Sequence, residues 1–186
     1  YFEAAVYRRF DLPMRRFLLE LAPFEQFDLE MARMVSGDPH AGDLLDWLLH
    51  NTTMLRCEDL HTFSFWPQFR AFLLWQMGRE YNDEKRKAIF GRGGLYYELK
   101  EDYAHALACY TKGGDHSKVS DLLVRNAELH PGMGHYSEME NYYRSLPESE
   151  IAASPSLMQG MSMLCALAMD YEGSERWYRE LREFWK

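Results

Sequence analysis

Histidines and carboxylates are the residues of this sequence that could support catalysis or bind a metal. Seven histidines are scattered along the chain, and only His130 and His135 lie close together, on either side of a Pro-Gly turn. No cysteine or carboxylate joins them in a persuasive metal-binding pattern. Glu148 and Glu150 form a near pair of carboxylates, but nothing nearby indicates the burial that an acid/base pair needs. We therefore expect neither a metal site nor a catalytic site.

Amphipathic spacing predicts four short helices in the first fifty residues. The first covers residues 2–10, and Pro13 suits the first turn of the second. Asp28 is expected to cap the third helix and Gly37 to end it. The dipeptide Asp38-Pro39 is expected to open the fourth, whose apolar stripe comprises Ala41, Leu44, Leu45 and Leu48.

The pattern then changes to alternation typical of strands. Residues 53–57 and 62–66 are rich in β-branched or aromatic side chains and are separated by a polar turn, which predicts a β-hairpin. Pro67 ends the hairpin and starts another helix. Helices, a hairpin and a further helix outline a winged-helix domain over residues 1–79.

A winged helix suggests DNA binding, and the expected fourth helix tests this. A recognition helix presents Arg, Lys, Asn or Gln to base edges. Residues 41–51 instead carry Asp43 and Asp46 on the polar face and contain neither Lys nor Arg. Proteins that contact phosphates usually carry clustered basic residues, whereas this chain has a net charge of −8 and no extended basic stretch in its sequence. We expect a winged helix of a type that makes no nucleic-acid contact.

Only helices are expected from about residue 82 onward, with breaks at 113–115, 130–132, 146–147 and 171–173. A tetratricopeptide-like pattern of bulky, small and aromatic positions fits Phe90, Gly94, Tyr97, Ala106 and Tyr110. A shift of 68 residues gives Met158, Ser162, Cys165, Ser174 and Tyr178, in which Cys165 replaces an aromatic residue. The intervening repeat does not fit that register. We therefore expect a degenerate, tetratricopeptide-like array of helical hairpins over residues 80–186, and a mainly α protein as a whole.

The sequence also bounds the cellular setting. No apolar run is long enough to cross a membrane, and no secretory leader opens the chain. Cys57, Cys109 and Cys165 are odd in number and far apart, so each is expected to be a small buried residue in a reducing compartment. These features predict a cytoplasmic protein. The first residue, Tyr1, indicates that the chain is a piece of something longer.

Three stretches resemble one known family. They are residues 12–19 (LPMRRFLL) with the preceding Tyr1-Phe2, residues 63–73 (FSFWPQFRAFL), and residues 168–178 (AMDYEGSERWY). The first two are similar to the winged-helix segment of large ATP-dependent LuxR-type transcriptional regulators, the maltose-regulator-like signalling ATPases. The third is similar to the early repeats of that family's sensor arm.

The resemblance implies a modular parent protein. In this family an ATP-binding module precedes the winged helix, a tetratricopeptide-like superhelix follows it, and a C-terminal helix-turn-helix binds promoter DNA. This chain has neither a G-x-x-x-x-G-K-[ST] phosphate loop nor a basic helix-turn-helix at its end. ATP or ADP is thus implied for the parent, and no cofactor for this chain. The implied partners are the missing ATP-binding module, the rest of the sensor arm, and an unknown small-molecule or protein effector.

One position departs from the family pattern. The family usually has a His-Pro-x-Phe motif after the wing, and its histidine matches one that senses the nucleotide phosphate in related signalling ATPases. Here Trp66 occupies that place. An indole offers one N–H and no titratable charge, so phosphate sensing by this residue is in doubt. Three roles stay open for Trp66: stacking on a base, packing against the ATPase module, or a half-buried place at a domain junction.

Two hypotheses of different classes follow. The first is a non-enzymatic internal fragment of a LuxR-type regulator, which couples the missing ATP-binding module to the sensor arm by conformational change. The alternative is a standalone helical-repeat adaptor that binds a protein or peptide. A DNA-binding winged-helix protein is a third and weaker hypothesis.

Overall fold

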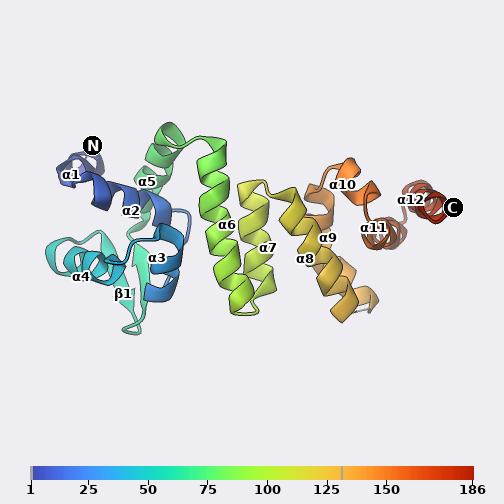
Figure 1. Ribbon diagram of the computed structural model, residues 1–186, viewed down its shortest axis with the longest axis horizontal. Helices are drawn as coiled ribbons and strands as arrows, with labels where there is room; N and C mark the ends of the chain where they lie inside the picture. Colours follow the sequence, from blue (N-terminus) through green and yellow to red (C-terminus); the bar gives the residue numbers. More distant parts are fainter. Residues whose placement is uncertain (1, 131) are drawn as a thin grey trace. The chain divides into compact units, whose positions relative to one another are not determined.

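The computed structural model describes residues 2–130 and 132–186. The chain divides into two compact units, residues 1–102 and 103–186. They are drawn in blue to green and in green to red in Figure 1. The expected domain division between residues 79 and 80 stays a prediction.

The first unit consists of short helices and one hairpin, in the order that the sequence predicts. Local caps set the boundaries of the third helix: Asp28 Oδ1 accepts the N–H of Met31 (2.7 Å) at its start, and Gly37 ends it with φ of +64°. The elements are α1 (Phe2–Arg9), α2 (Leu12–Leu21), α3 (Leu29–Ser36), α4 (Ala41–Asn51), β1 (Leu55–Glu58), β2 (Thr62–Phe65), α5 (Pro67–Glu80) and α6 (Asp83–Leu99).

The expected start of the fourth helix is wrong by about two residues. Asp38 does not cap α4; its Oδ1 accepts the N–H of His40 (2.8 Å), and its carbonyl accepts the N–H of Ala41 (3.2 Å). This local bond makes Asp38-Pro39 a turn that precedes the helix, an alternative that aspartate side chains often stabilise. Ala41, Leu45 and Leu48 are buried as expected, whereas Leu44 is only half-buried.

The hairpin closes one side of this unit. β1 and β2 are antiparallel, with Leu55 opposite Phe65 and Glu58 opposite Thr62. Phe27 adds an isolated bridge to Phe63 on β2. The core beneath the hairpin is apolar. Its most deeply buried side chains include Phe17, Leu18, Leu21, Met31, Leu45, Leu48, Phe69 and Leu73. Arg70 joins α5 to the end of α2 by donating to the carbonyls of Ala22 (2.9 Å) and Pro23 (3.0 Å).

The second unit consists of helical hairpins. The breaks at 113–115, 130–132 and 146–147 are confirmed, although Pro131 lies outside the described residues. A short helix before the last hairpin was not predicted. The elements are α7 (Tyr103–Gly113), α8 (His116–Leu129), α9 (Met133–Ser145), α10 (Glu148–Ala152), α11 (Pro155–Leu167) and α12 (Tyr171–Phe184).

The expected break at residues 171–173 is wrong, because the turn comes three residues earlier. Met169 has φ of +60°, and the N–H of Asp170 donates to the carbonyl of Cys165 (2.8 Å). Asp170 then caps α12 by accepting the N–H of Gly173 (3.0 Å). A Cβ on Gly173 would collide with this carboxylate. The glycine therefore makes room for the cap instead of breaking the helix.

Close approaches hold the hairpins together. The Oγ of Ser162 on α11 donates to the carbonyl of Ser174 on α12 (2.9 Å), so two of the predicted small positions meet. Gly160 packs against the buried ring of Tyr143 on α9, where an added Cβ would lie 2.6 Å from a ring carbon. Small residues at these points let the helix backbones approach each other.

Cysteine burial follows the expectation in two cases of three. Cys109 and Cys165 are buried, but Cys57 is exposed, because its strand β1 is buried only at Leu55. Within residues 2–130 and 132–186, no helix has the length and apolar character required to span a bilayer.

Candidate functional site

The side of α6 that faces the winged helix carries a polar seam, defined here as Arg92, Tyr96 and Lys100. These residues follow one another at i, i+4 and i+8, so they lie on one helix face. Each contacts α3 or the cap that precedes it. The seam therefore fixes how the helix after the winged helix lies on α3.

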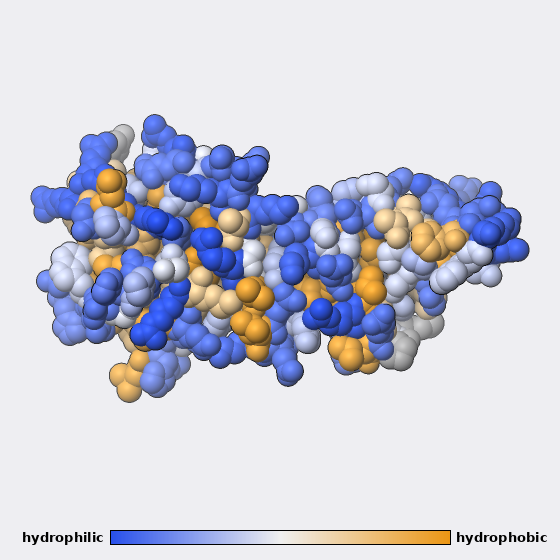
Figure 2. Space-filling view, viewed as in Figure 1, coloured by the Kyte–Doolittle hydropathy of each residue, from blue (hydrophilic) through white to orange (hydrophobic). Residues whose placement is uncertain are grey.

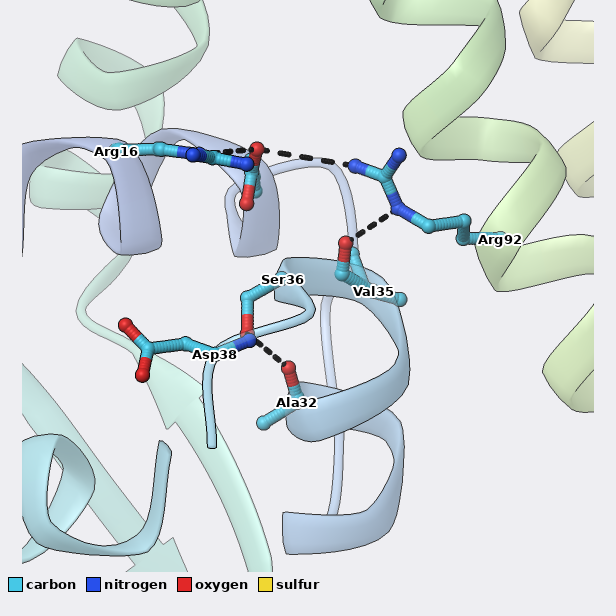
Figure 3. A network of polar contacts seen from close by, with 7 residues as sticks. Arg16, Ala32, Val35, Ser36, Asp38 and Arg92 are labelled. Carbon is cyan, nitrogen blue, oxygen red and sulfur yellow. Dashed lines mark hydrogen bonds and ion pairs between the residues drawn. The ribbon is translucent and has the colours of Figure 1, made fainter. Parts of the chain in front are cut away.

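Arg92 occupies the strongest position in the seam. Its Nε donates to the carbonyl of Val35 (2.6 Å), in the last turn of α3 (Figure 3). Carbonyls at a helix C-terminus lack partners within the helix and carry the negative end of its dipole. A guanidinium from α6 thus caps α3 by both hydrogen bonding and charge.

The same guanidinium approaches a buried carboxylate on α2. Glu20 Oε1 accepts a hydrogen bond from Arg16 Nε (3.1 Å) and lies 3.7 Å from Arg92 Nη2. The Glu20 side chain is only 7% exposed, and its Oε2 has no hydrogen-bond partner among the described residues. Burial raises the pKa of Glu20, and Arg16 and Arg92 oppose that shift. Removing either arginine would leave a poorly compensated buried charge.

The other two seam residues reach the beginning of α3. Tyr96 donates its hydroxyl proton to Asp28 Oδ2 (2.8 Å), while Oδ1 of the same carboxylate caps α3. Burial and this hydrogen bond raise the pKa of Tyr96. Lys100 Nζ lies 2.7 Å from Glu30 Oε2 in an exposed pair, which contributes little on its own. Both ends of α3 are therefore bonded to α6.

Trp66, which stands where the family usually has a histidine, lies at the N-terminus of α5. Its N–H donates to the carbonyl of Met54 (2.8 Å), and its carbonyl accepts the N–H of Arg70 (2.8 Å), so its backbone is held on both sides. The indole is 43% exposed. The Arg56 guanidinium lies 4.6 Å from the centre of its ring. The structure therefore pairs this indole with a permanent positive charge at the base of the hairpin.

The other candidate residues do not form a site. Glu148 pairs with Arg176 (2.7 Å), whereas Glu150 accepts a hydrogen bond from Ser120 (3.2 Å). The rings of His130 and His135 have centroids 5.9 Å apart. In the described part of the chain, no group of three or more histidine, cysteine or acidic side chains has an arrangement that could hold a metal ion. Asp43 and Asp46 are exposed on α4.

Glu20, Arg92 and Arg56 are the residues that sequence reasoning missed. Glu20 had a signal: it is an acidic residue inside the buried run of α2, and charged residues are rarely buried unless they are paired. Arg92 had none, because its partner is a main-chain carbonyl 57 residues away. Arg56 lies opposite Ser64 in the hairpin register, two residues before Trp66, so correct strand pairing would have found it.

Comparison with known proteins defines the first part of the chain as a winged helix. Residues 3–85 match the family model of the MalT winged helix domain. No curated protein matches the chain. The match covers less than half of the chain and is consistent with a MalT-like, LuxR-type regulator. The expected fold class, a mainly α protein with a winged helix, a small β-hairpin and a following helical array, is confirmed.

Proposed function

We propose that the chain is an internal part of a LuxR-type transcriptional regulator, in which it couples an ATP-binding module to a helical-repeat sensor arm by conformational change. The winged-helix match supports the regulator class. In this proposal the chain is cytoplasmic, has no catalytic activity and makes no DNA contact. The ATPase module, its ATP or ADP, and the DNA-binding domain lie elsewhere in the parent.

The polar seam is the observation that carries the coupling. The family match ends at residue 85, in the first turn of α6, and the seam begins seven residues later. Arg92 and Tyr96 bond the two ends of α3, so a displacement of α6 must move α3 or break these bonds. A rigid joint of this kind converts movement of a sensor arm into movement of the winged helix.

Two features of the helices after the winged helix support a tetratricopeptide-like arm. The predicted small positions at Ser162 and Ser174 meet in the α11–α12 hairpin. Asp102 and Asp170, 68 residues apart, close similar turns: each donates its N–H to a carbonyl five residues back, after a non-glycine residue at positive φ. The turn with a non-glycine residue at positive φ thus recurs at twice the 34-residue tetratricopeptide period. A glycine version of it also closes at Asp115.

The last helix favours an array with further hairpins. Tyr171 and Tyr178 of α12 and Trp185, directly after it, recur every seven residues and are 70%, 55% and 73% exposed. Repeat arrays bury such stripes against the next hairpin. The alternative function, a standalone adaptor, is favoured by the same stripe, because an exposed aromatic row is also a common protein-binding surface.

Nucleotide and effector measurements on the parent protein, with its native flanking sequence, test the coupling. Arg92→Gln breaks the cap on α3. Lys100→Gln removes an exposed pair with Glu30 and a long cation–π contact with Tyr96, leaves that cap in place, and serves as the matched control. We expect Arg92→Gln to uncouple the two sites, so that the effector no longer changes nucleotide affinity, and Lys100→Gln to leave the coupling intact. An unchanged coupling free energy in Arg92→Gln contradicts the mechanism. Native flanks without a phosphate loop would favour the adaptor.

A further inference from the structure

Three arginines surround a groove between α1 and α5 in the first unit. Arg8 comes from the last turn of α1, Arg15 from α2, and Arg79 from the last turn of α5. The groove has a volume of about 680 Å³. Figure 2 shows a mainly hydrophilic surface at the upper left, where Figure 1 places α1 and the end of α5. We call these arginines, with the rings beside them, the arginine groove; the rings are Tyr7, Phe72 and Trp75.

The positive charge of the arginine groove is not neutralised within the chain. Among the described residues, no ion pair includes any of its three arginines. Of the described residues that line it, only Glu80 is acidic, and its Oε1 already accepts hydrogen bonds from Tyr7 (3.4 Å) and Gln76 (2.5 Å). The groove is therefore a local positive region on a chain whose net charge is −8.

The three guanidinium groups have different roles. Arg15 supports the fold: its Nε donates to the carbonyl of Tyr7 (3.2 Å) and its Nη2 to that of Arg8, so it caps the C-terminal end of α1. Arg79 lies over the indole of Trp75, with its guanidinium carbon 4.8 Å from the ring centre. The guanidinium groups of Arg8 and Arg79 are exposed and donate to no described residue. Their N–H groups are available to a ligand.

An aromatic wall borders these cations. Trp75 is 55% exposed. The ring of Phe72 lies 6.1 Å from the indole and 5.5 Å from the ring of Tyr7, measured between centroids. Indoles at binding surfaces supply a large, rigid contact area at a low cost in side-chain entropy. The arginine groove therefore suits a ligand that has an apolar part beside its negative charges.

Carboxylates fit this groove better than phosphates. Guanidinium groups bind both anions, but a phosphate is favoured at a helix N-terminus, where N–H groups and the positive end of the dipole face it. The arginine groove instead includes the last turns of α1 and α5, whose dipoles are negative and oppose a phosphate dianion more than a single carboxylate. A nucleic acid is disfavoured further, because the chain as a whole is acidic.

We propose that the arginine groove binds a short acidic segment of a partner protein, with carboxylates on Arg8 and Arg79 and an apolar side chain on Trp75. The segment is defined by its chemistry: acidic residues on both sides of a large apolar one. Complementary charge brings such a segment to the groove and sets its orientation. The contact is small and open to solvent, so binding is weak, reversible and sensitive to salt.

Fluorescence anisotropy with the whole chain and a short labelled peptide tests the proposal. In the probe, glutamates flank two leucines; matched probes carry lysine in place of glutamate, or glycine in place of leucine. We expect the glutamate–leucine probe to bind with a Kd on the order of 100 μM, as small interfaces do. Binding should weaken roughly tenfold between about 0.05 and 0.5 M salt. The glycine probe should bind more weakly, and the lysine probe not at all.

A pair of double variants assigns the contact to the groove. Arg8→Gln with Arg79→Gln removes both available guanidinium groups and keeps Arg15, which caps α1. It should weaken binding about tenfold or more, because hydrogen bonds to charged groups are lost. Arg33→Gln with Lys87→Gln removes the same charge from exposed helix positions that do not line the groove, and should bind like the wild type.

Trp75→Ala tests the apolar part of the contact. Circular dichroism first verifies that this variant and the double variants are folded. Trp75→Ala should lose several-fold in affinity for the glutamate–leucine probe and keep its affinity for the glycine probe, because only the leucines need the indole. Equal losses for both probes would contradict the proposed place of the apolar side chain.

Three further results overturn the proposal. If the wild type binds no acidic probe at about 1 mM, the limit of weak association, the arginines serve only as last-turn cations. Equal weakening in the two double variants would show general attraction to charge. Displacement of the probe by inorganic triphosphate at lower concentration than by unlabelled peptide would assign the groove to phosphates instead.

Discussion

The two units of this chain fix their helices by different chemistry. In the first unit, arginines reach across the fold to main-chain carbonyls: Arg70 bonds the end of α2, and Arg92 bonds the end of α3. In the second, Gly160 packs against the buried ring of Tyr143 without a polar bond, and ion pairs between helices, such as that of Glu148 with Arg176, join exposed side chains. A charged clamp specifies one relative position of its two elements, whereas apolar packing specifies mainly shape. The unit assigned to coupling is thus the one in which arginines bond the ends of helices.

The largest effect is expected where Gly160 packs against the ring of Tyr143 in the second unit. In Gly160→Ala the new methyl group overlaps the fully buried Tyr143 ring, so α9 and α11 must separate. We expect a loss of about 2–3 kcal/mol in urea unfolding monitored by circular dichroism. Gly91→Ala in α6 is the control: its Cβ meets open space, and the better helix former should add up to about 1 kcal/mol. Equal effects at both glycines would remove the contrast between the units.

Arg92→Ala tests the clamp of the first unit. It leaves the Val35 carbonyl uncapped and weakens the compensation of buried Glu20. We expect a loss of about 1–2 kcal/mol in the same urea assay. Lys100→Ala removes an exposed pair and a long cation–π contact with Tyr96, so it should shift the unfolding midpoint much less. If both substitutions behave alike, α6 is held by packing alone.

The pH dependence of stability should have opposite signs at two carboxylates. Burial raises the pKa of Glu20, so the folded state holds its proton more tightly than the unfolded state. Its contribution to stability therefore falls as pH rises from the ordinary glutamate pKa through the raised one. The Arg176 hydrogen bond lowers the pKa of Glu148, whose contribution is present above the ordinary pKa and is lost as pH falls through the lowered one.

Paired measurements isolate these two slopes. The difference in unfolding free energy between wild type and Glu20→Gln is followed from pH 3 to 7 and compared with the same difference for Glu148→Gln. We expect the Glu20 difference to move in favour of glutamine as pH rises and the Glu148 difference to move in favour of glutamate. Parallel slopes would show that Glu20 is solvated in the folded protein.

The smallest effect is expected at the hairpin base. Arg56 and Trp66 are partly exposed, and such cation–π pairs contribute about 0.5–1 kcal/mol. A double-mutant cycle of Arg56→Ala and Trp66→Leu should recover a coupling energy of about 0.5 kcal/mol. Additive effects would show that the indole is held by its backbone bonds alone.

Local signals predicted most of the fold, because helix caps and turns depend on neighbouring residues. Asp28, Gly37 and Pro67 mark helix ends where the structure has them. The prediction was wrong where a side chain bonds a different local group. Asp38 forms a turn, and Asp170 caps the last helix, so the last break lies nearer the N-terminus than expected. The competing short-range hydrogen bonds differ too little in free energy for residue spacing to show which of them forms.

Most of the candidate site could not be predicted from the sequence. Trp66 was found through a motif, since it occupies a fixed place beside Pro67. The seam was not, because Arg92 and Tyr96 bond groups 57 and 68 residues away. Their partners are a carbonyl and a capping carboxylate that already has a local role. Only the folded arrangement of α3 and α6 brings them together.

The contact between Gly160 and Tyr143 also constrains how this chain can evolve. A glycine that lies under a tyrosine ring cannot be replaced alone, and shortening the tyrosine alone would leave a void beside the glycine. The two positions should therefore change together in related sequences, with a larger residue on α11 matched by a smaller one on α9. A family alignment would show this as covariation between columns 143 and 160.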